Sequence, residues 1–273
     1  MVQAMTKANT PSLAELALID KTRETLGEAL PESPFLNDDA PYGTLAAPRG
    51  FDGENVGPFL DLTNLKPQAT VGDITSLCQE AAAQKAAAVC VNPCRVALAA
   101  KTLKKSQVKP ICVVGFPLGS GLAEATAYEA KQAIKAGARE VDMVQNVAFI
   151  KEGHFLEAYN HIKTVTDAAG KVPVKVILET CKLTDEEIVA SSLIAACAGA
   201  AFVKTSTGFA LDKLEQHPHT GATTAAVRLM RLAVGSDVGV KASGGIKTPE
   251  DAKTLLENGA SRLGASGLKD ASY

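Results

Sequence analysis

From about residue 59 onward, short apolar runs rich in β-branched residues alternate with longer, alanine-rich segments whose apolar positions recur at helical spacing. The first pattern is typical of strands and the second of amphipathic helices. The expected strands are residues 59–63, 88–92, 111–116, 140–144, 174–179, 201–204, 238–241 and 262–264. The expected helices are residues 70–86, 93–104, 122–136, 153–169, 184–197, 220–233 and 248–258. This alternation predicts a parallel sheet covered by helices.

Eight such units in about 205 residues favour a closed (β/α)8 barrel, the TIM-barrel form of the α/β class, over an open doubly wound sheet. Several expected helices begin with good N-cap chemistry, such as Thr184 ahead of Glu187 and Thr248 ahead of Pro249. The capping residues and the apolar pattern therefore predict the same starts for these helices.

Residues 1–57 do not follow this alternation of strands and helices. Ser12 and Glu15 form a capping-box pattern, and the leucines that follow as far as Leu30 predict a helix before Pro31. Residues 31–57, rich in proline and glycine, predict an irregular connector. We therefore expect an N-terminal extension (1–57), a barrel (58–266) and a short tail (267–273).

The stretch after the last expected strand is too short for a full closing helix. The truncated closing helix would leave a gap in the outer ring of the barrel. We expect the N-terminal helix (12–30) or a second subunit to cover it.

Composition narrows the class of protein. The chain of 273 residues is 46% hydrophobic and 21% charged, with a net charge of −2, which argues against a nucleic-acid partner. No apolar run approaches about 18 residues, and the N-terminus lacks the apolar core of a signal peptide, so we expect a cytoplasmic protein without membrane contact. The cysteines lie in periodic contexts and should be reduced and mostly buried: Cys78, Cys90, Cys94, Cys112, Cys181 and Cys197.

Two neighbouring strands each end in a lysine. Lys204 follows Ala201-Phe-Val, Lys241 follows Val238-Gly-Val, and small, hydroxylated residues and glycines come after both. Burial disfavours the ammonium form, a second nearby cation disfavours it further, and a neutral lysine amine is a nucleophile. The pair predicts an activated Schiff-base lysine; the alternative is two solvated lysines at strand ends.

Other strand ends carry groups that fit such a site. Alternation puts Asp142 on the opposite strand face from Val141 and Met143, and an inward carboxylate near an amine suggests a proton relay, or else a structural ion pair. Glycines and hydroxyls follow strands six, seven and eight, at 206–208, 243–245 and 264–266. Backbone N–H groups freed by glycine can bind an anion there, which predicts a phosphate site.

Metal and nucleotide chemistry have weaker support. Zinc held by histidines is the main chemical alternative to a Schiff-base lysine, but none of the four histidines ends a strand, and we expect all of them on the surface: His154, His161, His217 and His219. Cys90 and Cys94 lack partners for a metal site, and Gly119-Ser-Gly121 lacks the rest of a dinucleotide fingerprint. We therefore expect neither a metal nor a cofactor.

As an ordered set, six motifs carry a resemblance to a known family over about residues 58 to 266. They are Asp61-Leu-Thr63-Asn-Leu-Lys66-Pro, Val89-Cys90-Val-Asn-Pro, Val141-Asp142-Met-Val, Lys175-Val-Ile-Leu-Glu179-Thr, Phe202-Val-Lys204-Thr-Ser-Thr-Gly208-Phe and Val240-Lys241-Ala-Ser-Gly-Gly245-Ile-Lys-Thr. The set resembles the deoxyribose-phosphate aldolases. The resemblance implies a class I, metal-free lyase that reversibly joins acetaldehyde to D-glyceraldehyde 3-phosphate, giving 2-deoxy-D-ribose 5-phosphate.

The resemblance also implies roles for individual residues. Lys204 would form the Schiff base, Lys241 would perturb it, Asp142 would relay protons, and Tyr273 at the end of the tail would help to move the C2 proton. The substrate pocket would comprise Asp61, Thr63, Cys90, Thr205, Gly208, Gly244, Gly245, Gly264 and Ser266.

Two departures from the family pattern affect these expectations. One of the two serines common after the eighth strand is missing in Gly264-Ala-Ser266, and Tyr273 follows without the usual helix. We therefore expect the protein to act on a phosphorylated sugar with reduced efficiency. Separately, we expect it to form a homodimer. The alternative is an aldolase-fold protein that mainly binds another protein, for example a cytoskeletal component, through its N-terminal extension or its truncated C-terminal face.

Overall fold

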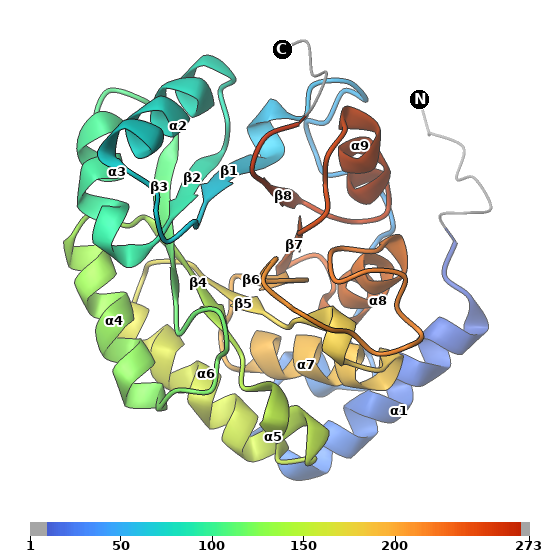
Figure 1. Ribbon diagram of the computed structural model, residues 1–273. Helices are drawn as coiled ribbons and strands as arrows, with labels where there is room; N and C mark the ends of the chain where they lie inside the picture. Colours follow the sequence, from blue (N-terminus) through green and yellow to red (C-terminus); the bar gives the residue numbers. More distant parts are fainter. Residues whose placement is uncertain (1–9, 269–273) are drawn as a thin grey trace.

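A computed structural model describes residues 10–268 and shows eight parallel strands closed into a barrel in chain order (Figure 1). The expected TIM barrel is confirmed. Closure occurs where the first strand pairs with the last, with Leu60 opposite Leu263. The strands are β1 (Leu60–Asn64), β2 (Ala88–Val91), β3 (Lys109–Val114), β4 (Glu140–Val144), β5 (Val174–Ile177), β6 (Phe202–Lys204), β7 (Gly239–Ser243) and β8 (Arg262–Ala265).

Helices surround the strands as the periodicity predicts. They are α2 (Val71–Ala83), α3 (Val96–Thr102), α4 (Ala123–Lys135), α6 (Phe155–Ala169), α7 (Asp185–Cys197), α8 (Thr224–Val234) and α9 (Pro249–Glu257). A short additional helix, α5 (Val147–Lys151), follows β4. The expected helix over 93–104 is instead a 3-10 turn, Pro93–Arg95, followed by α3. No helix among residues 10–268 is long and apolar enough to cross a membrane.

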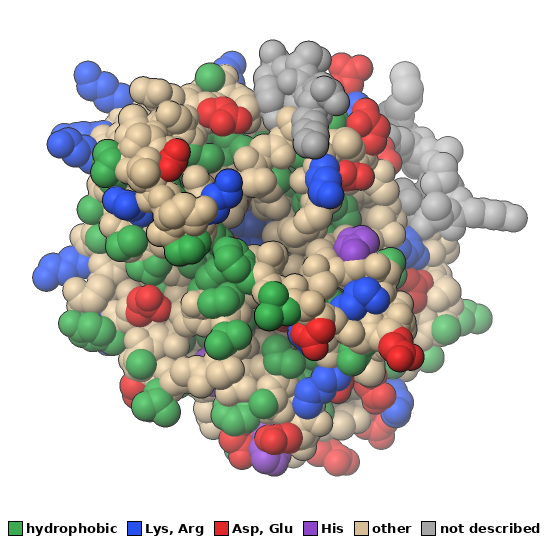
Figure 2. Space-filling model, viewed as in Figure 1, with side chains coloured by type: hydrophobic (Ala, Val, Ile, Leu, Met, Phe, Trp, Pro, Cys, Tyr) green, Lys and Arg blue, Asp and Glu red, His purple; other side chains and the backbone are tan. Residues whose placement is uncertain are grey.

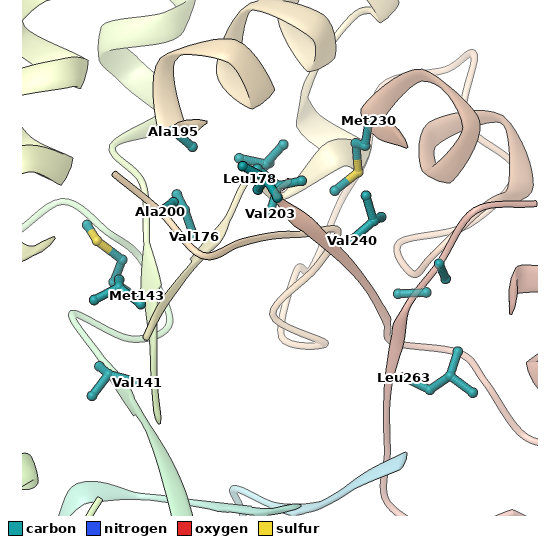
Figure 3. Packing of buried hydrophobic residues seen from close by; sticks show 14 of the residues in the cluster. Val141, Met143, Val176, Leu178, Ala195, Ala200, Val203, Met230, Val240 and Leu263 are labelled. Atoms are coloured by element: carbon teal, nitrogen blue, oxygen red, sulfur yellow. The ribbon is translucent and has the colours of Figure 1, made fainter. Parts of the chain in front are cut away.

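Alternation along the strands separates two layers of side chains. Val141 and Met143 of β4 are buried in the large apolar cluster between strands and helices, together with Val203 and Val240. Figure 3 shows Val203 and Val240 beside Met230, which comes from α8. Burying one such side chain contributes about 1.5–3 kcal/mol, so this layer fixes which faces of the strands turn outward. The residues between them therefore point into the barrel.

The expected N-terminal helix is α1 (Leu13–Ala29), and the Ser12–Glu15 capping box forms at its start. It buries Ile19 and Leu26 and packs mainly along α7 and α8 (Figure 1). The helix therefore does not lie between β8 and β1, where the sequence left a gap.

The connector runs on that side of the barrel instead. The Gly43 N–H donates to the carbonyl of Leu232 near the end of α8, Asp52 lies close enough to Lys253 of α9 to interact electrostatically, and Leu45 and Val56 are buried. The 3-10 turn Gly57–Phe59 then leads directly into β1. Within the described part of the chain, no helix follows β8.

Candidate active site

The interior of the barrel is apolar on one side and charged on the other. Inward positions of β2 and β3 form a small buried cluster in which Cys90 packs with Ala88, Ile111 and Val113. The remaining strands supply what we call the buried charge cluster, of which all members are buried except the partly buried Arg262: Asp61, Glu140, Asp142, Lys175, Lys204, Lys241 and Arg262. Charged groups removed from water must pair with one another, so their arrangement is tightly constrained.

Asp142 lies at the centre of this cluster and is fully buried. Lys175 Nζ donates to its Oδ1 at 2.9 Å, while Lys204 Nζ and Lys241 Nζ both donate to its Oδ2 at 2.9 Å. Burial alone would raise the pKa of Asp142, but the three lysines together hold it well below its usual value. Asp142 is therefore a carboxylate in direct contact with both strand-end lysines.

Lys241 is opposite Lys204 in the register of β6 and β7. Its Nζ lies 2.9 Å from Asp142 and 2.5 Å from Asp61 Oδ2, and its side chain is fully buried. Burial by itself would lower the pKa of Lys241, yet the two carboxylates raise it above the ordinary value. Lys241 is thus a stable ammonium beside Lys204.

Further ion pairs hold Asp61 and Lys175, the neighbours of Lys241 and Asp142, in place. Lys175 Nζ lies 2.6 Å from Glu140, and Arg262 Nη1 lies 2.8 Å from Asp61 and 3.3 Å from Glu140. Sequence reasoning assigned no role to Glu140, Lys175 or Arg262. The available signal was a charged residue at an inward position of each otherwise apolar strand.

A cavity of about 380 Å³ opens at the carboxyl ends of the strands, where the sites of this fold are built. Figure 2 shows this face hollowed at its centre, with hydrophobic side chains gathered along one side. The Lys204 side chain reaches the cavity although the residue is only 3% exposed. The other sequence-predicted residues on its lining are Thr63, Gly208, Gly244, Gly245, Gly264 and Ser266.

Other residues that the sequence singled out do not line this cavity. Asp61 is buried against Lys241 and Arg262, and Cys90 lies in the apolar cluster, where burial raises the pKa of its thiol. Thr205 ties β6 to β7, because its hydroxyl donates to the Ser243 carbonyl and accepts from the Ser243 N–H. Tyr273 lies outside the described residues.

The wall formed after β6 and β7 has the features of an anion site. Gly208, Gly244 and Gly245 adopt φ values of 81°, 84° and 77°, a region that favours glycine. Lys66 and Lys247 also line the cavity. Sequence reasoning quoted both lysines within motifs but gave them no role.

The expectation that all four histidines lie on the surface is wrong for two of them. His161 and His217 are buried, whereas His154 and His219 are exposed. The segment after β6 folds back over the end of β5, which places the His217 Nε2 2.7 Å from the carbonyl of Leu183. Among residues 10–268, no three His, Cys, Asp or Glu side chains are grouped so as to hold a metal ion.

The cysteines follow the expectation more closely. All six are free; Cys78, Cys90, Cys112 and Cys181 are buried, Cys197 is partly buried and Cys94 is exposed. The dominant cause acting on the buried thiols is desolvation, which raises the pKa of Cys181 to about 11. The buried thiols are therefore protonated near neutral pH.

The barrel thus holds three lysines on one buried carboxylate, that of Asp142. The sequence model of the DeoC/LacD family aldolases matches residues 59–269. The chain belongs to this family. The matched region contains every strand of the barrel and the whole buried charge cluster.

Relatives of the family cover most of the chain. A deoxyribose-phosphate aldolase of Clostridium perfringens strain SM101 is 49% identical over 216 residues, which is 79% of this chain and 93% of that protein. One from Thermoanaerobacter sp. strain X514 is 48% identical over 79% of this chain and 95% of that protein. A solved structure of the deoxyribose phosphate aldolase from Aeropyrum pernix matches with a TM-score of 0.69 at 28% identity, over 94% of each chain.

Proposed function

We propose that this family member is a deoxyribose-phosphate aldolase that cleaves 2-deoxy-D-ribose 5-phosphate reversibly to D-glyceraldehyde 3-phosphate and acetaldehyde through a Schiff base on Lys204. The observation that carries the proposal is the position of Lys204. Its amine lies at the bottom of the cavity, 2.9 Å from a buried carboxylate that a second lysine, Lys241, also binds. The names of the relatives described above supply the substrate.

The charges around Lys204 favour an amine that can act as a nucleophile. The cluster contains three carboxylates, on Asp61, Glu140 and Asp142. Lys109, Lys175, Lys241 and Arg262 already supply four cations in direct contact with them. A fifth positive charge on Lys204 would lie next to the ammonium of Lys241, and like charges at short range disfavour each other. This arrangement supports a role for the Lys204 amine as the nucleophile that attacks a carbonyl.

The proposed reaction begins when Lys204 Nζ attacks the C1 aldehyde of the open-chain sugar. Loss of water from the resulting carbinolamine gives a protonated imine. The C2–C3 bond then breaks, its electrons move into the imine to form an enamine, and the C3 hydroxyl loses its proton as D-glyceraldehyde 3-phosphate leaves. Protonation at C2 and hydrolysis release acetaldehyde and restore the amine. Asp142 can accept the proton that Lys204 releases, because its Oδ2 is within hydrogen-bond distance.

Several other residues on the cavity lining are suited to the phosphate. Lys66 and Lys247 provide positive charge, and the glycines of the β6 and β7 loops allow the backbone to approach an anion. Ser266 adds the hydroxyl that remains after β8. This arrangement supports a phosphorylated substrate with its aldehyde at Lys204.

Reductive trapping tests the mechanism directly. Wild-type protein is incubated with acetaldehyde and sodium borohydride, and the site of the reduced adduct is located by peptide mass spectrometry. We expect one ethyl adduct on Lys204 and none in Lys204→Leu, whereas Lys247→Leu should retain it as a matched lysine control. An unmodified Lys204 in wild type, or an equal adduct in Lys204→Leu, would show that the mechanism is wrong.

The homodimer, the cytoplasmic location and the protein-binding alternative stay predictions. Steady-state cleavage of 2-deoxyribose 5-phosphate separates the two functions, since ordinary turnover favours the metabolic enzyme and very low turnover favours a binding role. The sedimentation velocity of the purified protein tests the assembly.

A further inference from the structure

Glu179 has an unusual backbone conformation next to the proposed site. It follows β5 and precedes the 3-10 turn Thr180–Lys182, with φ 58° and ψ 57°. Within residues 10–268, Lys85 is the only other non-glycine residue at positive φ. A left-handed conformation costs a non-glycine residue roughly 1–2 kcal/mol. Such a conformation persists where surrounding contacts fix it, often near functional sites.

The contacts of the Glu179 side chain explain what fixes it. Its carboxylate is buried and accepts two hydrogen bonds from one residue, the N–H of Thr207 at 3.2 Å and the Thr207 hydroxyl. The backbone of β5 continues to pair with the segment after β6 on both sides of Glu179. The Leu178 N–H donates to the Lys204 carbonyl, and the Thr180 N–H donates to that of Thr205.

The hydrogen bonds of Glu179 continue through Thr207 to residues that line the cavity. Thr207 Oγ1 accepts the Phe209 N–H at 3.0 Å, and the Phe209 ring packs edge-on against Phe116 with 5.3 Å between centroids. Thr207, Gly208 and Phe209 all line the cavity, whereas Glu179 does not. Glu179 therefore holds three wall residues without touching the cavity itself.

Within the segment Thr207–Phe209, the network leaves one backbone donor unused. The N–H groups of Thr207 and Phe209 are both used by the contacts above. The N–H of Gly208, between them, has no partner within the described part of the chain. Gly208 has a φ of 81° and lines the same cavity as Lys247. An unpaired N–H beside glycine and a lysine suits a phosphate oxygen.

We propose that Glu179 is a positioning residue that holds the segment Thr207–Phe209 so that the Gly208 N–H binds the substrate phosphate, and thereby sets the selectivity for phosphorylated over unphosphorylated sugar. The inference rests on the proposed function and adds to it the residue that builds the phosphate-side wall. Burial raises the pKa of Glu179, whereas the hydrogen bonds from Thr207 and the charges of Lys204 and Lys182 oppose the rise.

Glu179→Gln tests the proposal because it keeps the size of the side chain and removes its charge. The readout is the ratio of kcat/KM for 2-deoxyribose 5-phosphate to kcat/KM for 2-deoxyribose. We expect the ratio to fall about tenfold or more, which corresponds to the loss of one charge-assisted hydrogen bond to the wall. The change should lie mainly in KM for the phosphorylated sugar. The matched control is Glu186→Gln, on the exposed side of α7 where Glu186 pairs with Lys21, and it should leave the ratio unchanged.

Variants of Thr207 separate positioning from general damage. Thr207→Val removes the hydroxyl and should reproduce the lower ratio, while Thr207→Ser keeps the hydroxyl and should restore it. Glu179→Gln combined with Thr207→Val should lose little more than either single variant, because both changes break the same contact. Circular dichroism melts identify any variant that has lost its fold.

Trapping with acetaldehyde distinguishes the failure of this inference from the failure of the proposed function. A normal Lys204 adduct in Glu179→Gln together with a reduced ratio supports the inference. A ratio within about twofold of wild type, equal losses for both sugars, or additive losses in the double variant would each overturn it. If wild-type protein forms no adduct, the proposed function fails first and this inference fails with it.

Discussion

Lys175 should stabilise the fold as the cation that two buried carboxylates share. Its Nζ contacts Oδ1 of Asp142 at 2.9 Å and Oε2 of Glu140 at 2.6 Å. Removing one partner of a buried ion pair leaves an uncompensated charge, which typically costs about 3–5 kcal/mol. Lys175→Met keeps the aliphatic stem packed and removes the cation.

The expected result is a free energy of unfolding that is lower by about 3–5 kcal/mol. Without Lys175, Asp142 keeps its contacts with Lys204 and Lys241, and Glu140 keeps those with Lys109 and Arg262. We therefore expect a loss toward the lower end of that range. The assay is urea denaturation of wild type and variant near neutral pH, followed by circular dichroism.

A second substitution tests whether charge balance is the cause. Glu140→Gln removes the carboxylate that lies 2.6 Å from Lys175. The double variant Lys175→Met with Glu140→Gln should therefore lose less stability than the two single variants added together. An unchanged free energy of unfolding in Lys175→Met, or fully additive losses in the double variant, would refute the charge-balance argument.

Three further predictions follow from the same contacts. Lys241→Met leaves Asp61 and Asp142 without their shared cation and should lower the free energy of unfolding by about 3–5 kcal/mol, measured by urea denaturation. The folded-state pKa of Asp142 is depressed, so the stability that its carboxylate contributes is complete above the unfolded pKa of 3.8. That stability should be lost as the pH falls toward the folded-state pKa. Urea midpoints measured down to about pH 3 should therefore decline less steeply in Asp142→Asn than in wild type. Lys247→Leu should raise KM for 2-deoxyribose 5-phosphate about tenfold and leave KM for 2-deoxyribose nearly unchanged, and an equal rise for both sugars would remove Lys247 from the phosphate site.

Alternation along the strands determined a large part of the site. Because Val141 and Met143 are apolar, Asp142 between them must point into the barrel, and Val203 and Val240 orient Lys204 and Lys241 in the same way. Capping boxes such as that of Ser12 and Glu15 are equally local, which explains why helix starts were predicted within a few residues. These features depend only on residues a few positions apart.

Pairing across the barrel depends on closure and register, which no local pattern contains. The sequence placed Lys204 and Lys241 on neighbouring strands, but only the register sets them opposite each other on one oxygen of Asp142. The sequence also could not show that Lys175 contacts the other oxygen of Asp142, because this contact joins residues in the middle of two different strands, β5 and β4.

The conformations of several turns and loops also could not be predicted from local sequence. The expected strand over 174–179 ends at Ile177, because Glu179 turns left-handed to reach Thr207. The segment after β6 buries His217 by folding back over β5, and the connector rather than α1 runs past α9 to β1. In each case the decisive partner lies far away in the chain. Such a contact becomes available only after the barrel has closed, and so only the tertiary structure could decide it.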